Sequence, residues 1–158
     1  MLNFLAMLLF TILIVLPKTS YSQTVELEEI QPLSFGTIVV LSNVEVESYQ
    51  ISKEGNVELS DNLLVFSPGQ RGLYRVTGLP PNSNVLLSTQ ILDNFFRSTE
   101  LNTERFRFTS LNTSVVHRTD DTGRVVLPVG GTISTSGNGS LVFGAAPHTA
   151  DFIVEIDY

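Results

Sequence analysis

The fold is decided by the stretch Leu33–Ile38, which reads LSFGTI. Its alternation of side chains predicts a short β-strand, with Leu33, Phe35 and Thr37 on one face. A glycine inside a strand marks a bulge or a close backbone approach, so we expect Gly36 to serve backbone geometry rather than chemistry. The stretch therefore predicts a first core strand.

Segments with the same period of two recur along the chain, separated by turns rich in Gly, Pro, Asn and Asp. The clearest expected strands are Thr24–Ile30, Val44–Ser48, Gly72–Gly78, Asn84–Gln90, Arg105–Thr109, Arg124–Val129 and Phe152–Tyr158. This regular spacing favours a sandwich or barrel over a βαβ fold. We predict an all-β antiparallel β-sandwich in which Leu33–Ile38 lies near Phe152–Tyr158.

Two details of that pattern are specific enough to test. Pro128 has no N–H group, so the strand around it should lie at an edge or break there. A tight turn at Ser136–Gly139 should send the chain back through Ser140–Phe143. The segment Ile91–Leu101 is compatible with a helical turn, a loop or a strand.

The N-terminal segment resembles an export signal. Phe4 to Leu16 is apolar except for Thr11, a length that suits a signal-peptide core better than a membrane span. We predict a signal peptide at 1–22, cleavage before Gln23, and one β-sandwich domain at 23–158. The start of the chain carries no Lys or Arg, which leaves an uncleaved anchor as the alternative; after cleavage no stable membrane anchor is expected.

The composition limits the classes of partner. Loss of Lys18 with the signal peptide changes the formal net charge from −7 to −8. An acidic chain does not neutralise phosphates, so nucleic acid is not an expected partner. The chain has no cysteine, and hence neither disulfides nor a lipid-bearing cysteine. We expect an exported protein of the periplasm, the cell surface or the extracellular space.

Three motifs in order make the chain resemble a secreted bacterial family, domain of unknown function 4402. They are Leu33-x-Phe35-Gly36-x-Ile38, Val129-Gly130-Gly131-Thr132 and the terminal Phe152-x-Val154-x-Ile156-x-Tyr158, with Phe66–Gly78 also fitting. The resemblance spans nearly the whole mature chain. It implies secretion and a pilin-like, immunoglobulin-like sandwich, and it implies no reaction, because the family has no assigned chemistry.

The sequence contains no convincing catalytic set. His117 and His148 are the only imidazoles, no Gly-x-Ser-x-Gly elbow is present, and thiol chemistry is excluded. Two isolated histidines without cysteine make a poor zinc set. Most carboxylates fall on the polar faces of alternating strands, which argues against a glycosidase pair. We therefore predict that the protein is not an enzyme.

Metal and cofactor sites are likewise not expected. Asp120–Asp121 and Asp61–Asn62 are the candidates for calcium, but neither has the alternating spacing of a calcium loop. Asp and Asn form turns through their own side chains, and this explains both pairs. The sequence thus predicts neither a bound metal nor a cofactor.

Two regions are candidates for partner binding. Thr24–Ile30 is a candidate donor strand, with Val25 and Leu27 as its inserted side chains. Arg97, Arg105 and Arg107 lie among phenylalanines, a combination found at binding hot spots. The phenylalanines themselves are more simply explained as core residues.

These observations leave two functional hypotheses. The first is an exported structural or surface protein, possibly a fimbria-like subunit that associates with itself or with other surface subunits through strand edges. The alternative is a monomeric secreted module that binds a glycan or a protein. It predicts that the N-terminal segment pairs with its own sheet. The sequence names no ligand and no assembly state.

Overall fold

The computed structural model describes residues 24–98, 103–140, 142–145 and 147–158. The predicted signal peptide and Gln23 lie outside this part of the chain. The regular structure of the described residues is all β, as the sequence predicts. Within that same part, no helix is long and apolar enough to span a membrane.

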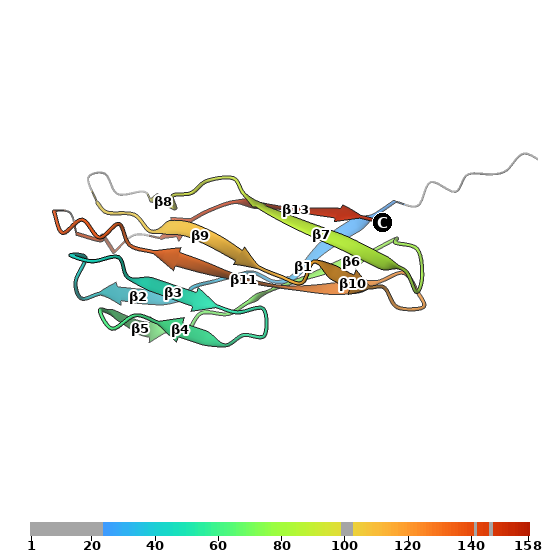
Figure 1. Cartoon of the computed structure of the whole chain (residues 1–158), viewed down its shortest axis with the longest axis horizontal. Coiled ribbons are helices and arrows are strands. Elements are labelled where there is room, and N and C mark those ends of the chain that lie inside the picture. The colour runs from blue at the N-terminus through green and yellow to red at the C-terminus, as the bar shows by residue number, and fades with distance from the viewer. Residues whose placement is uncertain (1–23, 99–102, 141, 146) are drawn as a thin grey trace, which may run out of the picture.

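The strands are arranged as an elongated structure with two layers (Figure 1). In chain order they are β1 (Glu26–Gln31), β2 (Thr37–Val40), β3 (Ser48–Ile51), β4 (Val57–Leu59), β5 (Leu63–Ser67), β6 (Gly72–Thr77), β7 (Asn84–Ile91), β8 (Arg97–Ser98), β9 (Arg107–Asn112), β10 (Val116–Arg118), β11 (Val125–Ser134), β12 (His148–Thr149) and β13 (Phe152–Asp157). The named strands pair only in the antiparallel sense among the described residues.

The larger sheet has the order β1-β6-β11-β3-β4, and β9 also pairs with β11. Its central strand, β11, changes partners along its length: residues 125–129 pair with β6, whereas residues 131–134 pair with both β3 and β9. Gly130 lies at this change, where a Cβ atom would stand 2.2 Å from the carbonyl oxygen of Ile51. Only glycine lets the two backbones approach so closely.

Pro128 does not break β11, contrary to one of the two outcomes expected from the sequence. It pairs with Leu73 on β6, and the ladder to β9 begins only at Gly130. The strand is therefore paired on one side at Pro128, which is the setting that tolerates a residue without an N–H group. The Thr113 hydroxyl donates a hydrogen bond of 2.9 Å to the Pro128 carbonyl.

The second layer consists of smaller sheets. One has the order β10-β7-β13, and two-stranded sheets join β12 to β8 and β2 to β5. The terminal strand β13 pairs with β7 from Phe152 to Asp157, so the chain end is held in a sheet as its alternating pattern predicts.

Two apolar clusters fill the space between the layers. The first contains the buried side chains of Tyr49, Ile51, Leu63, Phe96, Phe106, Phe108 and Ile133. The second contains those of Val76, Leu79, Val85, Leu87, Val125 and Leu127. Phe35 and Phe152 both pack against the first cluster, which confirms the predicted proximity of the opening stretch to the C-terminal strand.

The opening stretch is only partly a strand. Within Leu33–Gly36 only Ser34 makes a β-bridge, to Gln70, and β2 begins at Thr37. Gly36 has φ of +70°, and a Cβ atom there would lie 2.2 Å from the Ser67 carbonyl oxygen. The glycine thus has the geometric role that the sequence predicts.

Two segments that the sequence predicts as strands are not strands among the described residues. Val44 and Val46 are 72% and 64% exposed and lie outside any strand. Directly after Val46, the Glu47 N–H donates to the Thr135 hydroxyl, and the Thr135 N–H donates to the Glu47 carbonyl. The return strand at Ser140–Phe143 is also absent from the described residues. Instead, Phe143 forms a parallel bridge with Glu104.

Candidate functional site

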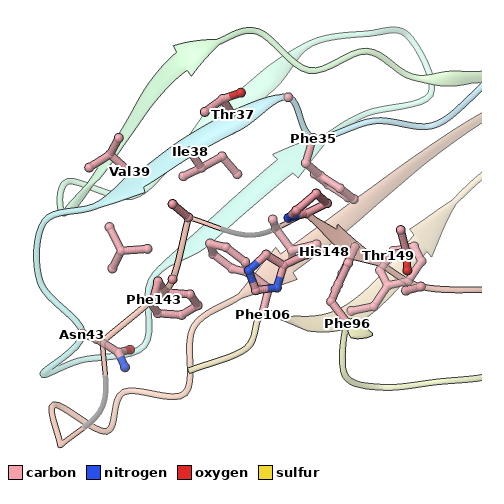
Figure 2. Close-up of a pocket in the computed structure, with 18 of the residues that line it drawn as sticks. Phe35, Thr37, Ile38, Val39, Asn43, Phe96, Phe106, Phe143, His148 and Thr149 are labelled. Atoms are coloured by element: carbon pink, nitrogen blue, oxygen red, sulfur yellow. The ribbon is translucent and has the colours of Figure 1, made fainter. Parts of the chain in front are cut away.

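An apolar groove of about 1060 Å³ opens beside the first core cluster. Residues 33–44 form one wall, and residues 142–145 and 147–150 form the other. Figure 2 shows Thr37, Ile38 and Val39 of β2 on one side, with Phe143, His148 and Thr149 across from them. We call this feature the β2–β12 groove.

The edges of two strands, rather than their faces, border the groove. Consecutive residues of β2 line it, and so do both residues of β12, whereas a strand face would contribute only alternate residues. Among the described residues β2 pairs only with β5, and β12 pairs only with β8. Within the described part of the chain, the edge of β2 opposite β5 therefore forms no ladder, and an unpaired strand edge is the geometry that accepts an added strand.

Aromatic side chains make up the base of the groove. Phe106 packs against Phe143 with ring centroids 4.5 Å apart, and against the His148 ring at 5.7 Å. Phe35 makes edge-to-face contacts with Phe96 and Phe108 at 6.2 and 6.0 Å. These contacts order the base while Phe35 and Phe143 remain only partly buried.

The groove is uncharged in a chain that is otherwise acidic. Its lining contains no Asp, Glu, Lys or Arg among the described residues, whereas the full chain has a formal net charge of −7. A charged side chain that entered it would lose hydration without gaining a partner. The groove therefore favours an apolar occupant over an ionic one.

A set of hydrogen bonds around Asn43, which we call the polar latch, lies toward one end of the groove (Figure 2). The Asn43 side chain donates to the Asn138 carbonyl at 2.9 Å, and its Oδ1 accepts from the Gly137 N–H at 3.2 Å. The Ser136 hydroxyl donates to the Glu104 carboxylate at 2.7 Å. The two Asn43 bonds join the end of the β2 wall to the segment that follows β11, and the Ser136 bond joins that segment to Glu104.

The two predicted donor residues, Val25 and Leu27, lie in or beside β1, which pairs with β6 of the same chain. Val25 packs against the second core cluster. Leu27 lies opposite the fully buried Val76 and is itself 59% exposed. The structure thus gives Val25 a place in its own core and leaves Leu27 largely uncovered.

The three predicted arginines are exposed and lie away from the groove lining. Arg97 forms an ion pair with Asp151, and the Arg107 guanidinium lies 5.1 Å from the centre of the Phe95 ring. The backbone N–H of Arg105 donates to the Glu104 carboxylate. Phe96, Phe106 and Phe108 are buried, as the core explanation predicts, whereas Phe95 is 48% exposed and contradicts it.

The two histidines lie on different sheets. The His117 ring on β10 is 3.1 Å from the Ser114 carbonyl, and desolvation lowers the pKa of this imidazole below 6.5. His148 lies in the β2–β12 groove.

The acidic turns have local structural roles. The Asp120 carboxylate accepts hydrogen bonds from the Thr122 N–H and hydroxyl and from the Arg124 N–H. The Arg124 bond is the main cause of its pKa falling below 3.8. Within the described residues, no three His, Cys, Asp or Glu side chains come together to hold a metal ion.

Sequence reasoning did not identify the groove. The run Ile38–Leu41 is continuously apolar, which signals a strand with apolar surroundings on both faces. Phe143 lies in a Gly- and Pro-containing segment with no periodicity, so nothing in its neighbourhood places it opposite β2.

A family model described as Domain of unknown function (DUF4402) matches residues 25–158. Comparisons with curated proteins and with solved structures find no match.

Proposed function

The chain belongs to the family of domain of unknown function 4402, and we propose that it is an exported, non-enzymatic surface protein that associates through strand edges. Its partners are further copies of itself or other surface subunits. The pilin-like and immunoglobulin-like character that the resemblance implies forms part of this proposal, as does removal of the signal peptide at 1–22.

One observation carries the proposal: the β2–β12 groove has an apolar, uncharged base, and β2, which forms part of one wall, pairs only with β5 among the described residues. A strand added to the edge of β2 would form main-chain hydrogen bonds with it and place alternate side chains on the base. Backbone pairing supplies affinity, and the spacing of the inserted side chains selects the register.

The arrangement of polar groups supports a non-enzymatic role. The Asp120 carboxylate is engaged by its own turn, and His117 and His148 belong to different sheets. A nucleophile, a base and an orienting acid must lie within hydrogen-bond reach of one another. No such arrangement joins these three groups.

The alternative of a monomeric binding module has one observation in its favour. β1 pairs with β6 of its own chain, as that hypothesis predicts. The exposed Arg107–Phe95 pair would then belong to a surface that contacts a glycan or a protein. The state of association in solution separates the two functions.

The test is sedimentation of the purified mature chain over a range of concentrations up to its solubility limit. Leu41→Lys and Val142→Lys place a charge at exposed apolar positions of the groove, which are 63% and 77% exposed. We expect both variants to reduce association at least tenfold. Val115→Lys is the control, because this residue is 65% exposed and lies outside the groove.

The control variant carries the same added charge, so a general electrostatic effect would change all three proteins equally. A chain that stays monomeric at every concentration would refute self-association. Equal effects of Leu41→Lys and Val115→Lys would refute the groove as the site.

A further inference from the structure

We propose that a second pocket binds a small organic anion through a carboxylate or phosphate group. This pocket has a volume of about 610 Å³ and is lined by residues of β6, β10, β11 and the turn between the last two strands. It shares no lining residue with the β2–β12 groove, and Figure 1 shows β10 and β2 toward opposite ends of the long axis. We call it the arginine pocket. Binding there is independent of the groove and goes beyond the proposed function.

The arginine pocket is positively charged in a chain that is otherwise acidic. Its described lining contains Arg75, Arg118 and Arg124 against a single acidic residue, Asp120. His117 also lines it but is largely uncharged at pH 7, because desolvation lowers the pKa of its imidazole below 6.5. The full chain, in contrast, has a formal net charge of −7. The pocket is therefore a local attraction for an anion.

Two of the three guanidinium groups are not neutralised by the protein itself. Within the described residues, the side chains of Arg118 and Arg124 take part in no ion pair. The nearby Asp120 carboxylate accepts its hydrogen bonds from the Thr122 N–H and hydroxyl and from the Arg124 backbone N–H. It is thus engaged by its own turn, and the two guanidinium groups keep their donors for a ligand.

The turn that carries these two arginines is ordered by the protein. Thr119 is 3% exposed, and its hydroxyl donates to the Pro80 carbonyl at 2.6 Å. The Asp120 N–H donates to the Arg124 carbonyl at 2.8 Å, which closes the turn. Because the backbone that carries Arg118 and Arg124 is already fixed, a ligand loses less affinity to the ordering of the site.

The larger sheet adds a charged and an apolar side chain to the pocket. Arg75 on β6 is directly opposite Val126 on β11, and such residues of an antiparallel pair point to the same face. Val126 is 45% exposed, so it can contact an uncharged part of the ligand. Arg75 lies 2.8 Å from the Glu28 carboxylate, but this ion pair is exposed to solvent and exposed pairs are weak. An anion can therefore compete with Glu28 for Arg75.

The chemistry of the lining indicates the class of ligand. A guanidinium group presents a planar fork of N–H donors that matches the oxygens of a carboxylate or a phosphate. A polyanion would extend beyond the pocket and meet the acidic remainder of the surface. A small anion keeps its charge within the pocket, where repulsion from acidic groups more than about 8 Å away is largely screened at physiological salt.

The test is a titration of the isotope-labelled mature chain followed by heteronuclear NMR. Galacturonate supplies a carboxylate and glycerophosphate a phosphate, with galactose and glycerol as their uncharged counterparts. We expect saturable shifts of the backbone amides of Arg118, Arg124 and Val126 with at least one anion, at an affinity at least tenfold above that of its counterpart. The anion that saturates the shifts at the lower concentration identifies the preferred group.

Substitutions of exposed residues test the roles of the arginines. Arg118→Gln and Arg124→Gln each remove one charge and should weaken binding at least tenfold. Arg105→Gln is the matched control, because this arginine is also exposed and lies outside the pocket, and it should leave binding unchanged. Glu28→Gln releases Arg75 and should strengthen binding at least twofold. Circular dichroism verifies that each variant remains folded.

The outcomes keep this site separate from the groove. Absence of saturable shifts with both anions refutes the arginine pocket as a binding site. Equal weakening by Arg118→Gln and Arg105→Gln also refutes it, because a general charge effect would then be sufficient. Leu41→Lys lies in the groove and should bind the anion as the parent chain does, whether or not it still associates. Loss of anion binding in that variant would overturn the independence of the two sites.

Discussion

Replacement of Gly36 by alanine should destabilise the protein more than any change at an ordinary surface glycine. Its φ of +70° lies in the left-handed region, which costs an L-residue about 1–2 kcal/mol. The added Cβ would lie 2.2 Å from the Ser67 carbonyl oxygen and 2.7 Å from the Pro68 carbonyl carbon. Both neighbours are backbone atoms, so the β5 end must move, which costs about 1–3 kcal/mol more.

The expected loss in free energy of unfolding is therefore about 2–5 kcal/mol. Urea denaturation with far-ultraviolet circular dichroism measures it. Gly139→Ala is the matched control, because its Cβ would meet nothing nearer than Val44 Cγ2 at 3.4 Å. That variant should stay within about 1 kcal/mol of the parent.

A third variant, Gly36→Asn, separates the cost of the left-handed backbone angle from the cost of the clash with the Ser67 carbonyl oxygen. Asparagine tolerates the left-handed region better than alanine but carries the same Cβ. If the clash with Ser67 dominates, Gly36→Asn and Gly36→Ala should lose similar stability. Equal stability of Gly36→Ala and Gly139→Ala would refute the geometric role of Gly36.

Three further substitutions test other parts of the structure. Leu127→Ala, at a side chain with no exposure, should cost about 2–5 kcal/mol in urea denaturation, and an unchanged midpoint would contradict the core assignment. Asn43→Ala opens the polar latch and should cost about 1–3 kcal/mol; the exposed Asn84→Ala should cost less than about 0.5 kcal/mol. Because the pKa of Asp120 is lowered in the folded protein, its carboxylate stabilises the fold at any pH above 3.8. This contribution is lost as the pH falls through the lowered pKa. Thermal melts should therefore show Asp120→Asn less stable than the parent at neutral pH and equal to it in strong acid; a constant gap would contradict this.

Alternation predicted the strands that are buried on one face. β13, β6 and β7 follow the period-two pattern of their sequences, because one side of each packs against a core cluster. The same signal was misleading at Val44 and Val46, where apolar residues alternate but no layer covers them. Alternation shows that a strand could be half buried, but it does not show whether an opposing layer exists.

The groove could not be read from the sequence for a related reason. Its walls come from residues near 40 and near 148, which only the completed topology brings together. The sequence predicts Phe35 and Phe106 as core residues. It does not show that both line the β2–β12 groove, because that depends on which strands pair with one another. Alternation also predicts Val25 as a donor residue. It does not distinguish a strand that pairs within its own chain from one that pairs with a partner chain.

The change of partners along β11 has a consequence for the order of folding. Its first half contributes Val125 and Leu127 to one cluster, and its second half contributes Ile133 to the other. Because β11 follows β3, β6 and β9 in sequence, these strands are synthesised before the strand that pairs with all three. Such long-range pairing makes folding slow and leaves strand edges open meanwhile. A chain trapped before Val125 emerges would expose β3, β6 and β9 without their common neighbour.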